Sequence, residues 1–281
     1  MPSPMRAPTP TPVTAIIARL RAAGCVFAEE EARLLISEAR TPDELAVMVD
    51  RRATGLPLEH ILGWTEFCGL RIAVDPGVFV PRRRTEFLVR QAAALIRRGG
   101  VVVDLCCGSG AVGVAVNAAL SYPSGRCELH AADNDPVAVR CARRNVEAAG
   151  GQVYVGDLDA PLPASLRGRV DVLVACTPYV PTSDITLMPP EARLHEPRAA
   201  LDGGLDGLDV VRRLGAVAPW WLAPEGHLLV ETSERQAAPA VEDFASSGLV
   251  PRRARCDKLN ATVVIGAMPE VADRSRAGPD A

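Results

Sequence analysis

Glycines and acids follow three successive strand-like runs, and their types suit the binding of a nucleoside. The stretch "VVVDLCCGSGAVG" (101–113) places Gly108 and Gly110 directly after a buried apolar run. Glycines there let the backbone turn tightly and approach a ligand closely. Asp133 ends the next apolar run, where a carboxylate can accept both hydroxyls of a ribose. Asp157 follows the third run, where it can accept the amino group of an adenine.

Each of these signals also has a purely structural interpretation. Glycines after strands are often only turns, and the stretch from Asp133 to Pro136 would cap a helix in any protein. Three signals in order at successive strand ends favour a nucleoside site. Gly108, Gly110 and Gly113 also satisfy the dinucleotide fingerprint GxGxxG, so glycine spacing does not separate NAD from other nucleoside ligands. The residues after the fourth strand must decide.

The elements that would position these residues alternate between strand and helix from residue 84 onward. Such alternation predicts an α/β fold, with a Rossmann-like parallel sheet covered by helices on both faces and an antiparallel pair at its end. The expected strands are 101–105, 127–133, 152–156, 170–175, 226–232, 249–255 and 260–266. The expected helices are 84–98, 111–120, 136–149, 207–222 and 234–246.

The chain divides into five parts. Residues 1–12 are Pro-rich and are expected to be a disordered tail. Residues 13–56 have the apolar periodicity of three short helices, which form a small helical domain. Residues 57–82 alternate apolar and polar side chains around turn signals, which predicts a β-hairpin linker. The α/β domain then spans 83–267, and 268–281 is a polar tail.

Composition excludes several classes of function. The net charge of −3 and the pI of about 5.9 give no general reason to bind nucleic acid. No apolar stretch reaches the roughly 18 residues of a membrane helix, and the N-terminus lacks the apolar core of a secretory signal. We therefore expect a cytoplasmic protein without membrane partners. The eight cysteines and four histidines show no ligand spacing, so no metal site is expected.

The stretch "VACTPYVP" (174–181) ends the fourth buried strand. It resembles the (Asn/Asp)-Pro-Pro-Tyr motif of class I methyltransferases that act on planar nitrogens. Together with "PLEHILGWTEFCGLRIAVDPGVFVPRRRTEFLV", "DLCCGSGAVGVAV", "AADNDPVAVRCARRN", "GDLDAPLP" and "PPEARLHEPRAALDGGLDGLDVVRR", it is similar to the HemK-type family of protein-glutamine N5-methyltransferases. These stretches span 57–213 in the family's order, and the helices before them match the family's N-terminal domain in kind.

The resemblance implies S-adenosylmethionine as methyl donor and S-adenosylhomocysteine as product. It also implies that the helical domain covers the substrate. The implied cofactor residues are Thr85, Asp104, Cys106, Gly108, Gly110, Asp133, Asn134, Asp157, Leu158 and Cys176. The implied substrate residues are Phe79 and Pro81 at the entrance, then Tyr179, Glu191 and Glu196. The implied catalytic residues are Cys176, Thr177, Pro178 and Tyr179.

The motif departs from the family at its first two residues. Cys176 stands where the family has asparagine, and cysteine is too weak a donor and acceptor to pair with a substrate amide. Thr177 stands where the family has its first proline, so a hydroxyl and a backbone N–H are gained. Cys176 is expected to serve as a small wall residue rather than as a nucleophile, because no histidine lies beside it in the sequence.

Three hypotheses about function follow from this departure. The favoured one is N-methylation of another planar nitrogen, such as the guanidinium of free arginine in a biosynthetic pathway, with Asp184, Glu191 and Glu196 as the candidate acids. The alternative is a protein glutamine, held by backbone carbonyls, on a release factor or another protein. The third is a protein that binds S-adenosylmethionine without turnover. A nucleic-acid adenine methyltransferase would share the motif, but the acidic pI counts against it.

Overall fold

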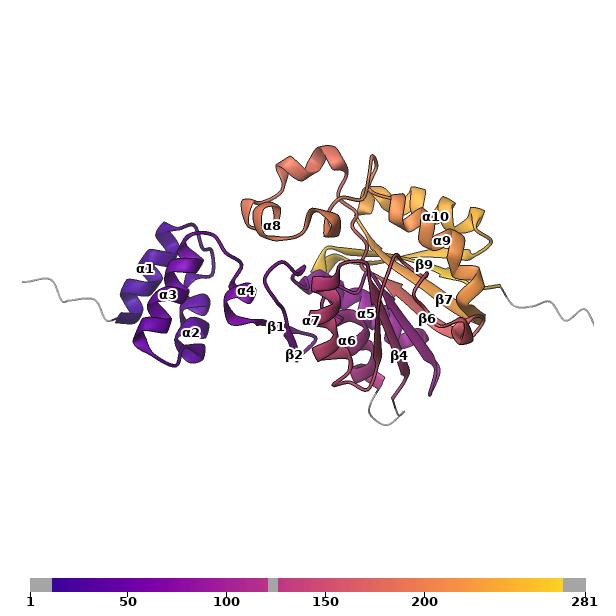
Figure 1. The fold of residues 1–281 in the computed structure, drawn as a ribbon. Helices are drawn as coiled ribbons and strands as arrows, with labels where there is room; N and C mark the ends of the chain where they lie inside the picture. The colour runs from indigo at the N-terminus through magenta and orange to yellow at the C-terminus, as the bar shows by residue number, and fades with distance from the viewer. Residues whose placement is uncertain (1–11, 121–125, 270–281) are drawn as a thin grey trace, which may run out of the picture.

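The computed structural model describes residues 12–120 and 126–269 (Figure 1). The expected tails, 1–12 and 268–281, lie almost entirely outside the described residues. Within the described part, no helix has both the length and the apolarity that crossing a bilayer requires.

The centre of the molecule is a seven-stranded sheet, and this confirms the predicted α/β class. Its strands, in spatial order, are β5 (Gln152–Val155), β4 (Glu128–Asp133), β3 (Val101–Leu105), β6 (Val170–Ala175), β7 (Leu222–Thr232), β9 (Ala261–Ala267) and β8 (Val250–Cys256). The first five run parallel, and β9 is antiparallel to both of its neighbours. Every residue of β3 and β6 is buried, as expected for central strands covered on both faces.

Helices cover both faces of the sheet (Figure 1), and each face has an apolar core of its own. On one face, side chains such as Val102 and Val174 pack against α5 (Glu86–Leu95), α6 (Ala111–Leu120) and α7 (Pro136–Val146). On the other face, neighbouring side chains such as Val103 and Ala175 pack against two further helices, α9 (Asp209–Trp221) and α10 (Ala237–Ser246). Successive strand residues thus alternate between the two cores.

The register brings the carboxyl ends of the parallel strands to one edge. Leu105 of β3 pairs with Ala132 of β4 on one side and with Ala175 of β6 on the other. Ala175 in turn pairs with Val230 of β7. The residues that follow these four positions are therefore neighbours, although they come from four separate parts of the sequence. This edge is where α/β sheets of this type bind their ligands.

The N-terminal part forms three helices, α1 (Pro12–Ala22), α2 (Ala28–Glu38) and α3 (Pro42–Ala53), with an apolar core of their own. Leu20, Leu35 and Val49 contribute to that core. The helix α3 begins at a side-chain cap, where Thr41 accepts a hydrogen bond from the backbone N–H of Glu44 at 3.1 Å.

The hairpin is shorter than the predicted linker 57–82. It consists of β1 (Trp64–Phe67) and β2 (Leu70–Ala73), and the preceding residues form a short helix, α4 (Leu58–Leu62). The apolar side chains of α4 are Leu58, Ile61 and Leu62, which have helical spacing and pack against the core of the N-terminal helices. Residues 74–82, in turn, form no strand.

The long segment after β6, where the sequence predicted neither a strand nor a helix, carries three short helical pieces. These are η3 (Thr182–Leu187), α8 (Pro190–His195) and η4 (Arg198–Ala200). The other short turns of helix are η1 (Arg83–Thr85), η2 (Ala164–Leu166), η5 (Glu234–Gln236) and η6 (Asp257–Leu259). The segment approaches the N-terminal helices through an ion pair between Arg52 and Glu191, 3.0 Å from nitrogen to oxygen.

Candidate active site

A cavity of about 300 Å³ opens at the carboxyl ends of β3, β4 and β6. Its size falls at the lower end of ordinary ligand pockets. Eleven residues that the sequence singled out line it: Phe79, Pro81, Thr85, Cys106, Gly108, Asp133, Asn134, Asp157, Leu158, Cys176 and Pro178. Eight others do not line it: Asp104, Gly110, Gly113, Thr177, Tyr179, Asp184, Glu191 and Glu196.

The segment that leads from β3 into α6 needs glycine at two positions, for two different reasons. Gly108 has a φ of +55°, and a side chain at this position would meet nothing within 4 Å, so the requirement is one of backbone conformation. Gly113 lies inside α6, where a Cβ would stand 2.9 Å from Leu129 and 3.1 Å from Asp104. Gly113 is therefore needed for close packing of the helix on the sheet, as is the last glycine of a dinucleotide fingerprint.

Asp104 lies behind this turn rather than in the cavity wall. Its Oδ2 accepts a hydrogen bond from the backbone N–H of Gly113 at 2.8 Å, which fixes the start of α6. The side chain is fully buried, and this burial raises its pKa to about 7. The sequence resemblance placed Asp104 against the methionine part of the cofactor, but in the structure it holds the turn from beneath.

Asp133 is oriented by two backbone amides at the tip of β4. Its Oδ2 accepts from the N–H of Gly108 at 2.8 Å, and its Oδ1 accepts from the N–H of Asp135 at 2.9 Å. Burial raises the pKa of Asp133, and these amide hydrogen bonds offset part of that effect. Each oxygen retains acceptor capacity, so the fixed carboxylate suits the paired hydroxyls of a ribose.

The far end of the cavity combines an apolar wall with an ion pair. Leu158 is buried and has a φ of +47°, which presents its backbone and side chain to the cavity. Asp157 pairs with Arg213 of α9 at 2.6 Å, and both side chains are more than half exposed. Arg213 was not singled out in the sequence. Asp157 keeps lone pairs beyond those that Arg213 uses, so it can still accept an amino group.

The four residues of the strand-tip motif point in two directions. Cys176 and Pro178 face the cavity, whereas Thr177 is buried beneath it. The hydroxyl of Tyr179 donates to Oε1 of Glu231 at 3.1 Å, so its ring faces β7 and not the cavity. Burial raises the pKa of the Cys176 thiol well above its ordinary value, and Glu231 adds to this. The thiol is therefore neutral and serves as a wall residue.

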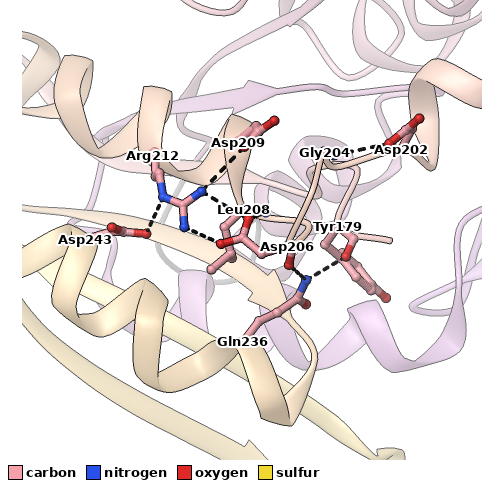
Figure 2. Close-up of polar contacts among 9 residues, drawn as sticks. All are labelled: Tyr179, Asp202, Gly204, Asp206, Leu208, Asp209, Arg212, Gln236 and Asp243. Carbon is pink, nitrogen blue, oxygen red and sulfur yellow. Dashed lines mark hydrogen bonds and ion pairs between the residues drawn. The ribbon is translucent and has the colours of Figure 1, made fainter. Parts of the chain in front are cut away.

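The main chain of the motif is held by a glutamine of η5, the short helical turn that follows β7 (Figure 2). The side-chain amide of Gln236 donates to the carbonyl oxygen of Tyr179 at 2.7 Å and to that of Asp206 at 2.9 Å. Its own oxygen accepts from the backbone N–H and the hydroxyl of Ser233. All of this buried amide's groups are thus engaged, and it joins three segments that are distant in the sequence.

Two glycines let the loop 202–208 lie directly against the motif. A Cβ on Gly203 would stand 2.6 Å from the carbonyl oxygen of Pro178. A Cβ on Gly207 would overlap the carbonyl oxygen of Tyr179 and the amide nitrogen of Gln236. The same loop carries Asp206, whose carboxylate pairs with Arg212 of α9 (Figure 2). The backbone geometry of the motif is therefore fixed from outside.

The acids proposed for a guanidinium already have partners. Glu196 is buried and accepts from Arg82 at 2.6 Å and from the backbone N–H of Val80 at 3.2 Å. Glu191 pairs with Arg52, and Asp184 is an exposed residue that accepts from the Ser183 hydroxyl. In addition, none of these three carboxylates lines the cavity.

The sequence reasoning missed three residues next to the motif: Arg84, Glu231 and Gln236. Glu231 had a usable signal, because it is an acid near the carboxyl end of a buried strand, "GHLLVET". Gln236 had none, because a glutamine in the first turn after a strand is common and only the fold brings it to Tyr179. Arg84 stands in a run of three arginines, 82–84, whose local sequence names no partner, and its Nε donates to Glu231 at 3.0 Å.

Comparison with known proteins places these features in a family. The family model described as "Methyltransferase small domain" matches residues 69–204. The release factor glutamine methyltransferase of Geobacter sulfurreducens is 40% identical over 212 residues, which cover 74% of this chain and 72% of that protein. The enzyme of the same name from Mycolicibacterium smegmatis is 37% identical over 224 residues, 78% of each chain.

A relative with a different name is almost as similar. The 4-amino-L-phenylalanine/4-methylamino-L-phenylalanine methyltransferase of Streptomyces pristinaespiralis is 38% identical over 207 residues, 71% of this chain and 69% of that protein. Among solved structures, a methyltransferase from Pyrococcus furiosus superposes with a TM-score of 0.52 at 17% identity and covers 72% of this chain and 90% of that one. This last likeness supports the fold.

Proposed function

The chain belongs to the HemK-type glutamine methyltransferase family and is an S-adenosylmethionine-dependent N-methyltransferase, and from this premise we propose that it methylates the side-chain amide of a protein glutamine. Relatives named as release factor glutamine methyltransferases support this choice. A release factor is the first protein to test.

The observation that carries the proposal is the immobilised backbone of the strand-tip motif. An amide nitrogen is a poor nucleophile, because its lone pair is delocalised, so the enzyme must hold the N–H groups and aim the nitrogen. Cys176 offers no strong acceptor for this. The carbonyl groups of the motif are strong acceptors, and Gln236, Gly203 and Gly207 fix the backbone that carries them.

The cavity fits S-adenosylmethionine, which supplies a sulfonium methyl group as the electrophile when it is bound. Asp133 holds two accepting oxygens toward the cavity for the ribose. Leu158 and Asp157 offer an apolar wall and an acceptor for the adenine. Thr85, Cys106 and Cys176 also line the cavity and would hold the methionine end of the cofactor.

Free arginine is a weaker candidate, although the altered motif first favoured it. A guanidinium needs free carboxylates arranged for its fork of donors. Glu196 and Glu191 each pair with an arginine of the chain itself, and Asp184 is exposed. A small aromatic amine is the second candidate, because one relative is named for 4-amino-L-phenylalanine and Cys176 would suit a substrate without an amide oxygen.

The experiment is methyl transfer from isotope-labelled S-adenosylmethionine, read by mass spectrometry across a panel. The panel holds a release factor with its Gly-Gly-Gln tripeptide, the same protein with that glutamine changed to alanine, free glutamine, free arginine and 4-amino-L-phenylalanine. We expect label on the first protein and none on its alanine variant. Label confined to a free amino acid would replace the proposal with a small-molecule function.

A further inference from the structure

Buried polar atoms without a partner gather beneath the strand-tip motif. Among the described residues, Oγ1 of Thr177 and Oε2 of Glu231 are inaccessible to solvent and form no hydrogen bond. Both side chains are only 2% exposed. An unpaired buried carboxylate oxygen is costly, and one that a native protein keeps calls for a donor that arrives with a ligand.

Glu231 lies next to Cys176 on the same face of the sheet. Ala175 and Val230 are paired in parallel register and contribute to the same core, so the residues after them point to the opposite face together. Glu231 also raises the pKa of the Cys176 thiol, and burial is the larger cause. Cys176 lines the cavity, and Glu231 lies on the neighbouring strand β7 without lining the cavity itself.

The other oxygen of Glu231 is fixed. Its Oε1 accepts from the Tyr179 hydroxyl at 3.1 Å and from Nε of Arg84 at 3.0 Å. The guanidinium of Arg84 also lies 5.5 Å from the centre of the Tyr179 ring, which restrains both side chains. These contacts engage Oε1 and leave Oε2 as the carboxylate oxygen of Glu231 that has no hydrogen-bond partner.

We propose that Oε2 of Glu231 accepts an N–H hydrogen of the substrate nitrogen and takes the proton as the methyl group is transferred. This inference rests on the proposed function and adds a catalytic residue to it. Glu231 would supply the acceptor that Cys176 lacks.

The step balances in atoms and charge. The nitrogen lone pair forms the new N–C bond as the bond from methyl carbon to sulfur breaks, and sulfur keeps that electron pair. The N–H bond breaks, its electron pair stays on nitrogen, and the proton moves to Oε2, from which water later removes it. The sulfonium charge and the carboxylate charge disappear together, so no new charge forms in a buried site.

The decisive variant is Glu231→Gln, which keeps the size of the side chain and an oxygen for Tyr179 and Arg84. We expect kcat on the methyl acceptor to fall by about 100-fold or more, as for loss of a general base. We expect the Kd of S-adenosylhomocysteine, from calorimetry, to stay within about twofold, since the cavity residues are untouched. A kcat within about threefold of the wild-type value would overturn the inference.

Chemical rescue separates a proton acceptor from a structural role. In Glu231→Ala, added formate should restore part of the lost rate, and chloride at equal ionic strength should not. A structural defect would respond to neither anion. Failure of formate to rescue a variant that still binds S-adenosylhomocysteine normally would count against Glu231 as the acceptor.

A crystal structure of a complex distinguishes failure of this inference from failure of the proposed function. If the wild-type enzyme labels no member of the panel, the proposed function fails. A crystal structure of the wild-type complex with S-adenosylhomocysteine and N-acetyl-L-glutamine amide then decides about Glu231. An amide nitrogen within hydrogen-bond distance of Oε2 supports the inference, and a nitrogen bound elsewhere overturns it.

Discussion

The side-chain amide of Gln236 and the carbonyl oxygen of Tyr179 lie 2.7 Å apart, and this hydrogen bond ties the strand-tip motif to the end of the neighbouring strand. The same amide nitrogen reaches the carbonyl oxygen of Asp206 at 2.9 Å. Tyr179 is thus held at both ends, by Gln236 at its carbonyl group and by Glu231 at its hydroxyl group. The first prediction follows from this arrangement.

Replacing Gln236 with glutamate should loosen the motif. The variant replaces the donating NH2 group of Gln236 with a carboxylate oxygen. That oxygen then faces the carbonyl oxygens of Tyr179 and Asp206 in a buried site. We expect a loss of about 1–3 kcal/mol in unfolding free energy from denaturant titration. We also expect kcat to fall by roughly tenfold or more through misplacement of the substrate.

The matched control for Gln236 is Ser233→Ala, which removes a hydroxyl from the other end of the same amide. It leaves the contact to Tyr179 intact, so kcat should stay near the wild-type value. Equal losses of kcat in the two variants would show that Gln236 supports the fold in general and does not position Tyr179 in particular.

Asp104 should make the stability of the ligand-free protein depend on pH. Its pKa is raised to about 7 in the folded protein, whereas an unfolded aspartate titrates near 4. The folded state thus binds the proton more tightly, so this contribution to stability is full below about pH 4 and is lost as pH rises toward 7. In Asp104→Asn, thermal unfolding between these pH values should depend less on pH. Curves that run parallel to the wild-type curve would contradict the assignment.

Asp133 should be essential for binding the methyl donor. Asp133→Ala removes both the ribose acceptor and the partner of the Gly108 amide. We expect calorimetry to detect no binding of S-adenosylmethionine at concentrations that saturate the wild-type protein. Asp184→Asn, at an exposed acid outside the cavity, is the control and should bind normally. Near-normal affinity in Asp133→Ala would mean that the nucleoside lies elsewhere.

The ion pair between Arg52 and Glu191 should restrain α8. Arg52 is 9% exposed and also pairs with Glu31, so changing it would leave a buried acid without its partner. Glu191 is 42% exposed, and Glu191→Gln is the milder change. We expect faster amide hydrogen exchange in 190–196 with little change in overall stability. Exchange that is unchanged in α8 would show that the pair does not restrain it.

Local sequence signals predicted most of the fold. The buried runs 101–105 and 170–175 coincide with β3 and β6, because central parallel strands are continuous apolar segments. The start of α3 also has a local signal, because Thr41 caps the helix and Pro42 is its first residue. The segment 58–62 was misassigned as part of the hairpin, since five residues with an apolar pattern fit a strand or a helix until their packing partner is known.

The site was predictable where it depends on one strand end and not where it depends on several. Asp133 and Gly108 follow strand ends that the sequence marks, and both line the cavity. Glu231 and Gln236 act on Tyr179, which lies more than fifty residues earlier in the chain. Only the pairing of β6 with β7 brings them together, and no local pattern encodes that pairing.

The proposed function requires that the methyl group reach the side-chain nitrogen of a protein glutamine. The most direct test incubates the wild-type enzyme with S-adenosylmethionine and an equimolar mixture of a release factor, free arginine and 4-amino-L-phenylalanine, then localises the methyl group by fragment-ion mass spectrometry. We expect a single methyl group on the amide nitrogen of the glutamine in Gly-Gly-Gln. A methyl group on either free amino acid, with the release factor unmodified, would contradict it.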